Sequence, residues 1–125
     1  MNHDQTVTLY DKIGDEKLRL LVETFYSLVQ QNEILSPLFK GDFITIKDKQ
    51  YCFLTQFLGG PMRYTEKYGV PKMRMRHLPH AIDQRAKEEW LKCMRKAIDS
   101  IELEEHLGNA LYNCFPAVAA HMVNR

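Results

Sequence analysis

The sequence lacks a continuous apolar run of the roughly 18 residues that a membrane-spanning helix needs. It also lacks an excess of charge, because 17 lysine and arginine residues nearly balance 16 aspartate and glutamate residues. The net charge of +1 therefore gives no reason to expect nucleic acid or an anionic membrane as a partner. Residues Met1–Gln5 carry neither a basic nor an apolar stretch, so no secretory signal is expected.

Cysteine is scarce, and the three cysteines lie far apart in the sequence. Cys52, Cys93 and Cys114 are odd in number and form no CxxC pair, which argues against a disulfide framework and a thiol metal site. Each falls within an apolar helical pattern, as small buried residues do in a reducing compartment, and we therefore expect a cytoplasmic protein. The phosphate-loop, dinucleotide-binding, HExxH and GxSxG motifs are also absent, which removes the commonest nucleotide, metalloprotease and hydrolase interpretations.

What the sequence does contain is the composition of an ordinary globular domain. Of its 125 residues, 45% are hydrophobic and 26% are charged. These values argue against disorder and fibrous repeats, and the length predicts a single domain over residues 1–125. A chain of this size buries enough surface for a core and one ligand site.

Hydrophobic residues recur with helical spacing along the whole chain. Asp15 and Asp83 are suitable N-caps for two long helices, and Gly59-Gly60-Pro61 ends another abruptly. Residues 59–72 are rich in glycine and proline and predict a long loop, a feature that is often functional in compact domains. The predicted helices cover residues 8–13, 15–31, 45–58, 84–101 and 104–122.

Two prolines limit the remaining helical segments. A short segment over Lys72–His77 is stopped by Pro79, and Pro116 should kink or restart the last helix. No segment shows a convincing strand pattern, and no internal repeat is present. The sequence therefore predicts an all-α fold.

Three side chains with polar tips lie on otherwise apolar helix faces. They are Tyr26, Gln50 and Trp90, and each belongs to a different predicted helix. Taken singly, each is more typical of a core residue whose tip finds a backbone partner. Taken together, they can converge on one buried polar spot.

The five histidines contain one suggestive pair. His77 and His80 form an HxxH motif, but Leu78-Pro79 between them spoils the helical geometry that chelation of a metal by the pair requires. The segment before His77 alternates cations with methionines. Such a segment is usually a solvated face, but it also suits a ligand that is apolar in body and carries carboxylates.

At this point the residues carry a resemblance, because several motifs occur in order over nearly the whole chain. The chain resembles the group II truncated haemoglobins of bacteria. The matching motifs are Phe25-Tyr26, Pro37-Leu38-Phe39, Phe53-Leu54-Thr55-Gln56-Phe57-Leu58-Gly59-Gly60-Pro61, Tyr64-Thr65-Glu66, Arg74-Met75-Arg76-His77-Leu78-Pro79, Trp90-Leu91-Lys92-Cys93-Met94 and Ala120-His121-Met122-Val123-Asn124.

The resemblance implies a truncated globin fold, a two-over-two helical sandwich around haem b. It implies that His77 is the proximal ligand of the haem iron, and that Tyr26 and Trp90 are distal residues. Gln50 and Ile46 match the two distal-helix positions that face the iron. The expected ligand is dioxygen or another diatomic molecule.

The chemistry of these side chains agrees with the resemblance. Haem iron needs a neutral imidazole on one side and an open position on the other. Bound dioxygen carries partial negative charge, and the phenol, amide and indole groups of Tyr26, Gln50 and Trp90 can each donate a hydrogen bond to it. Slow oxygen release, which suits retention or redox chemistry better than rapid transport, is therefore expected.

The porphyrin also needs an apolar wrapping and cations or hydroxyls for its propionates. The expected apolar contacts are Phe39, Phe53, Leu54, Phe57, Met73, Ile82 and Leu111. The expected propionate partners are Lys49, Arg74, Arg76 and Tyr64. His80 can pair with a propionate or be solvated, and the solvated position is the one expected.

Two residues depart from the family pattern. Ile46 is bulkier than the alanine or threonine that relatives often have there, so it should narrow the direct route to the iron. It cannot donate a hydrogen bond, which leaves that role to the other distal residues. Pro116 interrupts the last helix where relatives generally lack proline.

Three functional interpretations remain open. The first is reversible binding of dioxygen and related diatomics. The second is a redox enzyme at the same iron, for nitric oxide dioxygenation or peroxidase-like activity, with electrons from a separate reductant. The third, of another class, is a haem-free helical interaction module. Both a monomer and a homodimer are compatible with the sequence.

Overall fold

The structure is a computed structural model that describes residues 7–39, 41–72 and 82–124. These ranges contain helices and no strand, which confirms the all-α expectation. The helices are α1 (Leu9–Ile13), α2 (Asp15–Gln31), the 3-10 turn η1 (Ser36–Leu38), α3 (Phe43–Phe57), α4 (Arg63–Tyr68), α6 (Gln84–Ser100), α7 (Glu105–Tyr112) and α8 (Pro116–Met122).

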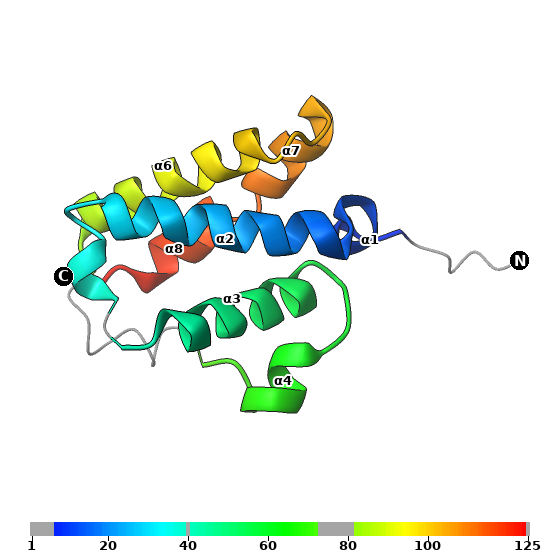
Figure 1. Cartoon of the computed structure of the whole chain (residues 1–125), viewed down its shortest axis with the longest axis horizontal. Helices are drawn as coiled ribbons and strands as arrows, with labels where there is room; N and C mark the ends of the chain where they lie inside the picture. The colour runs from blue at the N-terminus through cyan, green and yellow to red at the C-terminus, as the bar shows by residue number, and fades with distance from the viewer. Residues whose placement is uncertain (1–6, 40, 73–81, 125) are drawn as a thin grey trace, which may run out of the picture.

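The helices form two packed layers, α2 with α3 and α6 with α8. Helix α2 crosses the middle of the molecule, with α6 along one side and α3 along the other (Figure 1). Helix α8 packs against α6, and α4 packs against α3. This arrangement leaves a space lined by α3, α6 and α8, and the site lies there.

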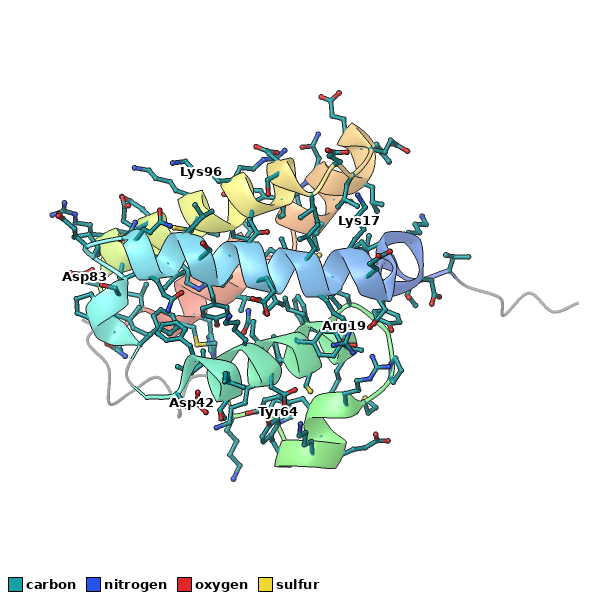
Figure 2. The ribbon with its side chains drawn as sticks, in the orientation of Figure 1. Lys17, Arg19, Asp42, Tyr64, Asp83 and Lys96 are labelled. Atoms are coloured by element: carbon teal, nitrogen blue, oxygen red, sulfur yellow. The ribbon has the colours of Figure 1, made fainter. Side chains whose placement is uncertain are left out.

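Short polar residues cap α1, α3 and α6. The N-cap expected at Asp15 is wrong, because α2 begins after Gly14 without a side-chain cap and Asp15 is its first helical residue. Thr8 and Asp11 form a reciprocal capping box at the start of α1. The carboxylate of Asp42 accepts a hydrogen bond from Ile44 N at 2.9 Å, and that of Asp83 accepts one from Ala86 N at 2.8 Å. Figure 2 shows both aspartates at the helix starts. The Asp42 cap explains why α3 begins at Phe43, two residues before the predicted start.

Helices α2 and α6 supply most of the core. Their buried residues recur at spacings of three and four, so each helix turns one apolar stripe inward. Between them lie the rings and aliphatic chains that exclude water from the helix crossing. The buried positions are Leu18, Leu21, Val22, Phe25, Tyr26 and Val29 on α2, and Ala86, Cys93, Met94, Ala97 and Ile98 on α6.

Gly59 and Gly60 allow α1 to lie against the end of α3. A Cβ atom at Gly60 would sit 2.7 Å from ring carbons of Tyr10 and 2.9 Å from the carbonyl oxygen of Thr55. The backbone N–H of Tyr10 donates to the carbonyl of Leu58 at 3.0 Å. Only glycine permits this close approach, which anchors the loop that leads into α4.

The structure differs from the sequence expectation in two segments. The predicted loop over 59–72 contains helix α4, whose Thr65 N–H donates to Gln56 Oε1 at 2.9 Å. The predicted helix over 104–122 is divided into α7 and α8, and Pro116 is the first residue of α8. A proline at that position loses no helical hydrogen bond, so it restarts the helix, as expected.

Across the described ranges, no helix is both long and apolar enough to pass through a lipid bilayer.

Candidate functional site

A cavity of about 370 Å³ lies beneath α2, between α3 on one side and α6 and α8 on the other. Its volume falls within the roughly 300–1,000 Å³ that is usual for small-molecule and cofactor pockets. Its wall is mainly aliphatic and aromatic, with a few polar groups from different helices. The predicted site residues that line it are Tyr26, Phe39, Ile46, Lys49, Gln50, Phe53, Leu54, Phe57, Tyr64, Ile82 and Trp90.

Tyr26 brings a hydroxyl to this largely apolar space. Its side chain is only 4% exposed, and its ring makes edge contacts with Phe25 at 4.9 Å and Phe39 at 5.6 Å between ring centroids. Its hydroxyl makes no hydrogen bond to any described residue. Within the described ranges, every side-chain oxygen or nitrogen that is shut off from open space has a hydrogen-bond partner, so this hydroxyl is not one of those shut off. The hydroxyl is therefore open to the cavity. Burial raises the pKa of Tyr26, so the phenol stays protonated and can donate.

Trp90 and Gln50 reach the same cavity from α6 and α3. Trp90, on α6, packs edge-on against Phe25 at 5.1 Å and against Phe115 at 5.7 Å between centroids. Gln50 lies on α3, one turn after Ile46, so both side chains face the cavity. The three residues singled out in the sequence for their polar tips thus line one space.

Aromatic rings form the wall on the α3 side. Phe53 and Phe57 stack with centroids 5.4 Å apart and planes inclined by 16°, and Phe53 meets the ring of Tyr64 edge-on at 6.1 Å. Figure 2 shows Tyr64 between α3 and α4. Flat, tightly packed walls of this kind suit a flat apolar ligand. Leu111 is fully buried in the core and does not line the cavity.

Two lysines meet the cavity at its edge. Lys49, on α3, was expected there, and its Nζ lies 5.4 Å from the ring centroid of Tyr68. Lys87, in the first turn of α6, was not expected, because a cation in a helical first turn is typically solvated. Met73, Arg74, Arg76 and His77, which were predicted as haem contacts, lie outside the described residues, as does His80.

Sequence reasoning missed the contribution of the last helix. Positions 115, 118, 119 and 122 recur with helical spacing, so this face was detectable as apolar but not as part of the site. Besides Lys87, the additional lining residues are Leu35, Leu38, Ala86, Phe115, Val118, Ala119 and Met122.

These residues fit a haem group. The walls are apolar and aromatic, hydrogen-bond donors come from α2, α3 and α6, and cations lie at the edge where carboxylates would meet solvent. An open hydroxyl on a buried tyrosine is costly unless something in the cavity accepts its hydrogen bond. The arrangement therefore suits a cofactor that holds a polar ligand near its centre.

Comparison with known proteins decides the family. The sequence model of the bacterial-like globins matches residues 8–124. The chain belongs to the bacterial-like globins. Their group II truncated haemoglobins are its relatives, which confirms the resemblance described above.

Three relatives illustrate how closely this globin matches known ones. It is 43% identical to group 2 truncated hemoglobin YjbI of Bacillus subtilis (strain 168), over 93% of this chain and 88% of that protein. The crystal structure of the group II truncated haemoglobin from Bacillus anthracis is 41% identical, with a TM-score of 0.91, covering 96% of this chain and 93% of that chain. The group II 2-on-2 haemoglobin of Agrobacterium tumefaciens is 34% identical, with a TM-score of 0.88, covering 99% and 98%.

Membership of this family establishes the fold and the cofactor. The fold of this globin is the two-over-two helical sandwich, formed by α2 with α3 and by α6 with α8. Its cofactor is haem with its iron, and it is a haem protein that binds diatomic gases. The haem-free interaction module is thereby excluded.

Proposed function

We propose that this truncated haemoglobin binds dioxygen in a hydrogen-bonded distal pocket and releases it slowly. One observation carries the proposal: the protonated hydroxyl of Tyr26 is open to the cavity although its side chain is only 4% exposed. A donor held in a water-poor cavity interacts strongly with any partly charged ligand that binds there.

The roles of the distal residues follow from their chemistry. Haem iron, when bound, supplies an open coordination position for a diatomic molecule. Tyr26 would donate its phenol O–H to a partly negative diatomic ligand, with Trp90 N–H and Gln50 N–H as further donors. Ile46 fills space beside Gln50 and keeps water away from these hydrogen bonds. Each bond to a charged acceptor is worth about 1.5–3 kcal/mol.

We propose that the neutral imidazole of His77 ligates the iron. The proposal rests on the resemblance, which matches His77 to the proximal ligand of the family. Ile82, the first described residue after His77, lines the cavity and is tied to Asn124 by two hydrogen bonds: Ile82 N to Asn124 Oδ1 at 3.0 Å, and Asn124 N to Ile82 O at 2.8 Å. This pairing holds one end of the segment that carries His77.

The haem edge requires partners for two propionates. We propose that Lys49 and Tyr64 serve there, together with Arg74 and Arg76 from the segment next to His77. Lys49 and Tyr64 line the cavity on the α3 and α4 side, where an ammonium and a hydroxyl can meet a carboxylate.

A relative supports slow release. The haemoglobin of Bacillus subtilis, whose crystal structure is 43% identical to this chain with a TM-score of 0.89, is described as oxygen-avid. Oxygen avidity is compatible with retention and with redox turnover, and less so with rapid transport. Turnover would draw electrons from a separate reductant. The three free cysteines suit a reducing cytoplasm, which we propose as the compartment.

Absorption spectra test the haem site and its proximal ligand together. The protein is purified with haem available, and ferric, ferrous and oxygen-exposed spectra are recorded beside those of the His77→Gly variant. We expect a Soret band and a stable oxygen complex in the wild type, and loss or a marked change of both in the variant. Added imidazole should restore the wild-type ferrous spectrum in the variant. Unchanged spectra in a haem-loaded His77→Gly protein would rule out the assignment of His77.

A further inference from the structure

Two tyrosines on α4 connect the cavity wall with the molecular surface. Tyr64 lines the cavity and is 3% exposed, whereas Tyr68, one turn later, is half-buried. Their ring centroids are 5.3 Å apart, and the ring of Phe53 lies 6.1 Å from that of Tyr64. The rings of Phe53, Tyr64 and Tyr68 are therefore in continuous contact from the cavity outward, and distal oxygen binding uses none of these contacts.

The outer tyrosine has its own proton acceptor. The hydroxyl of Tyr68 donates a short hydrogen bond to Oδ2 of Asp48, and Nζ of Lys67 lies 2.7 Å from the same oxygen. The lysine first, and the phenol second, hold the pKa of Asp48 below its usual range, so the carboxylate is charged at neutral pH. An oxidised phenol is a far stronger acid than a carboxylic acid, and this carboxylate is placed to take its proton.

Two cations favour the coupled loss of a proton and an electron. Nζ of Lys49 lies 5.4 Å, and that of Lys67 5.6 Å, from the ring centroid of Tyr68. These two positive charges raise the free energy of the cation radical that Tyr68 would form by losing an electron alone, because like charges repel in a partly desolvated setting. Tyr68 therefore loses an electron only if its proton moves to Asp48, which gives a neutral radical. The two lysines outnumber the one carboxylate paired with them, so the positive charge left beside the ring attracts small anions.

A second tyrosine–carboxylate pair provides a comparison. The hydroxyl of Tyr51 donates a short hydrogen bond to Asp15, and Arg19 and Arg63 lie over its ring. Within the described ranges, however, Tyr51 neither lines the cavity nor contacts another aromatic ring. It has the proton acceptor and the cations without the connection to the cavity.

We propose that Tyr68 is a surface electron-transfer site, linked to the haem cavity through Tyr64, at which small anionic one-electron donors are oxidised when hydrogen peroxide is reduced in the cavity. The inference uses the haem that the family establishes, and it is independent of slow oxygen release.

The reaction balances with peroxide as oxidant. Hydrogen peroxide accepts two electrons and two protons and gives two water molecules. For each electron, Tyr68 loses one electron towards the cavity through Tyr64 and its phenolic proton to Asp48. An ascorbate monoanion, the donor used as probe, then transfers a hydrogen atom to the Tyr68 radical and restores the phenol. Asp48 returns its proton to water, so two ascorbate anions give two ascorbyl radicals for each peroxide.

Rapid-freeze electron paramagnetic resonance of the haem-loaded protein, mixed with hydrogen peroxide, tests the proposal. We expect a tyrosyl radical signal in the wild type. It should be lost in Tyr68→Phe, which has no proton to release, and in Asp48→Asn, which retains a hydrogen-bond acceptor but cannot take the proton. The matched control Tyr51→Phe removes the same chemistry at the unconnected pair and should keep the signal. A full signal in Tyr68→Phe, or its loss in Tyr51→Phe alone, would overturn the assignment.

A measurement on the wild type does not depend on the folding of any variant. A nitroso spin trap added with peroxide should label Tyr68, as mapped by mass spectrometry of peptides, and excess ascorbate should prevent the label. Labelling confined to other tyrosines contradicts the proposal. Oxygen dissociation is measured on the same samples: a normal rate in Tyr68→Phe separates failure of this site from failure of the oxygen-binding proposal.

Discussion

Substitution of Tyr26 by phenylalanine removes one hydroxyl from the cavity and leaves the rest of the side chain in place. The ring contacts with Phe25 and Phe39, at 4.9 and 5.6 Å, do not involve the hydroxyl, so the aromatic packing is retained. The hydroxyl makes no hydrogen bond to the described residues, so its removal leaves none of them without a partner. The variant should therefore fold like the wild type and differ mainly towards the ligand.

The expected size of the effect follows from one charge-assisted hydrogen bond. Loss of about 1.5–3 kcal/mol of stabilisation corresponds to a roughly 10- to 100-fold faster release of dioxygen, since about 1.4 kcal/mol is one factor of ten. The value should lie towards the upper end, because the side chain is buried and the cavity excludes the water that would otherwise compete for the bond.

Stopped-flow mixing of the oxygen complex with excess carbon monoxide measures this rate. Tyr112→Phe is the matched control, because Tyr112 packs against Arg95, 5.3 Å from its ring centroid, and does not line the cavity. Carbon monoxide carries little negative charge when bound, so its own release should change far less than that of dioxygen. Equal oxygen release in the wild type and a haem-loaded Tyr26→Phe protein would show that the phenol does not bind the ligand.

Three further substitutions test the frame around the site. Gly60→Ala forces a Cβ to within 2.7 Å of the Tyr10 ring, and overpacking of about 1–3 kcal/mol should appear as a lower urea midpoint. Asn124→Ala removes the side-chain acceptor of Ile82 N–H, a loss of about 0.5–1.5 kcal/mol, and should speed transfer of haem to apomyoglobin. The pKa of Asp15 is lowered by hydrogen bonds from a phenol and then a guanidinium. Its folded pKa lies below the unfolded one, so its stabilisation is present above the unfolded pKa and is lost as pH falls through the folded pKa. Unfolding free energies of Asp15→Asn should therefore approach those of the wild type in acid, and parallel pH profiles would contradict this.

The long helices were predictable because their cause is local. Residues 15–31 were predicted as one helix from the apolar spacing and the start at Asp15, and α2 has these bounds. For α3 the predicted range of 45–58 was close, but Asp42 was not recognised as the cap. Spacing locates the middle of a helix, whereas the start of α3 depends on one side chain that accepts a backbone hydrogen bond.

Helix α4 was not predictable in the same way. Six residues are too few for a stable isolated helix. It is held by tertiary contacts: Gln56 Nε2 donates to Thr65 Oγ1 at 2.8 Å, and Tyr64 is buried against Phe53. These partners lie on α3, so the helix forms only once α3 is in place.

At the site, the sequence indicated which helix faces would converge, but it did not indicate that Lys87 would lie at the edge of the cavity. Tyr26, Gln50 and Trp90 stood out because polar tips on apolar faces are unusual, and all three line the cavity. Lys87 did not stand out, because many surface helices carry lysine. Its place at the cavity edge depends on how α6 meets α8, which periodicity does not report.

The packing of α2 on α6 also sets the distance between two of the proposed hydrogen-bond donors to dioxygen. Phe25 is fully buried, and its ring contacts Tyr26 at 4.9 Å on one side and Trp90 at 5.1 Å on the other. A phenylalanine that meets two donor-bearing rings edge-on fixes their separation more firmly than loop residues would, because the close-packed core transmits any shift. The donor geometry at the cavity is thus a property of the helix crossing, and a change that loosens the core beside Phe25 would reach the bound ligand without touching it.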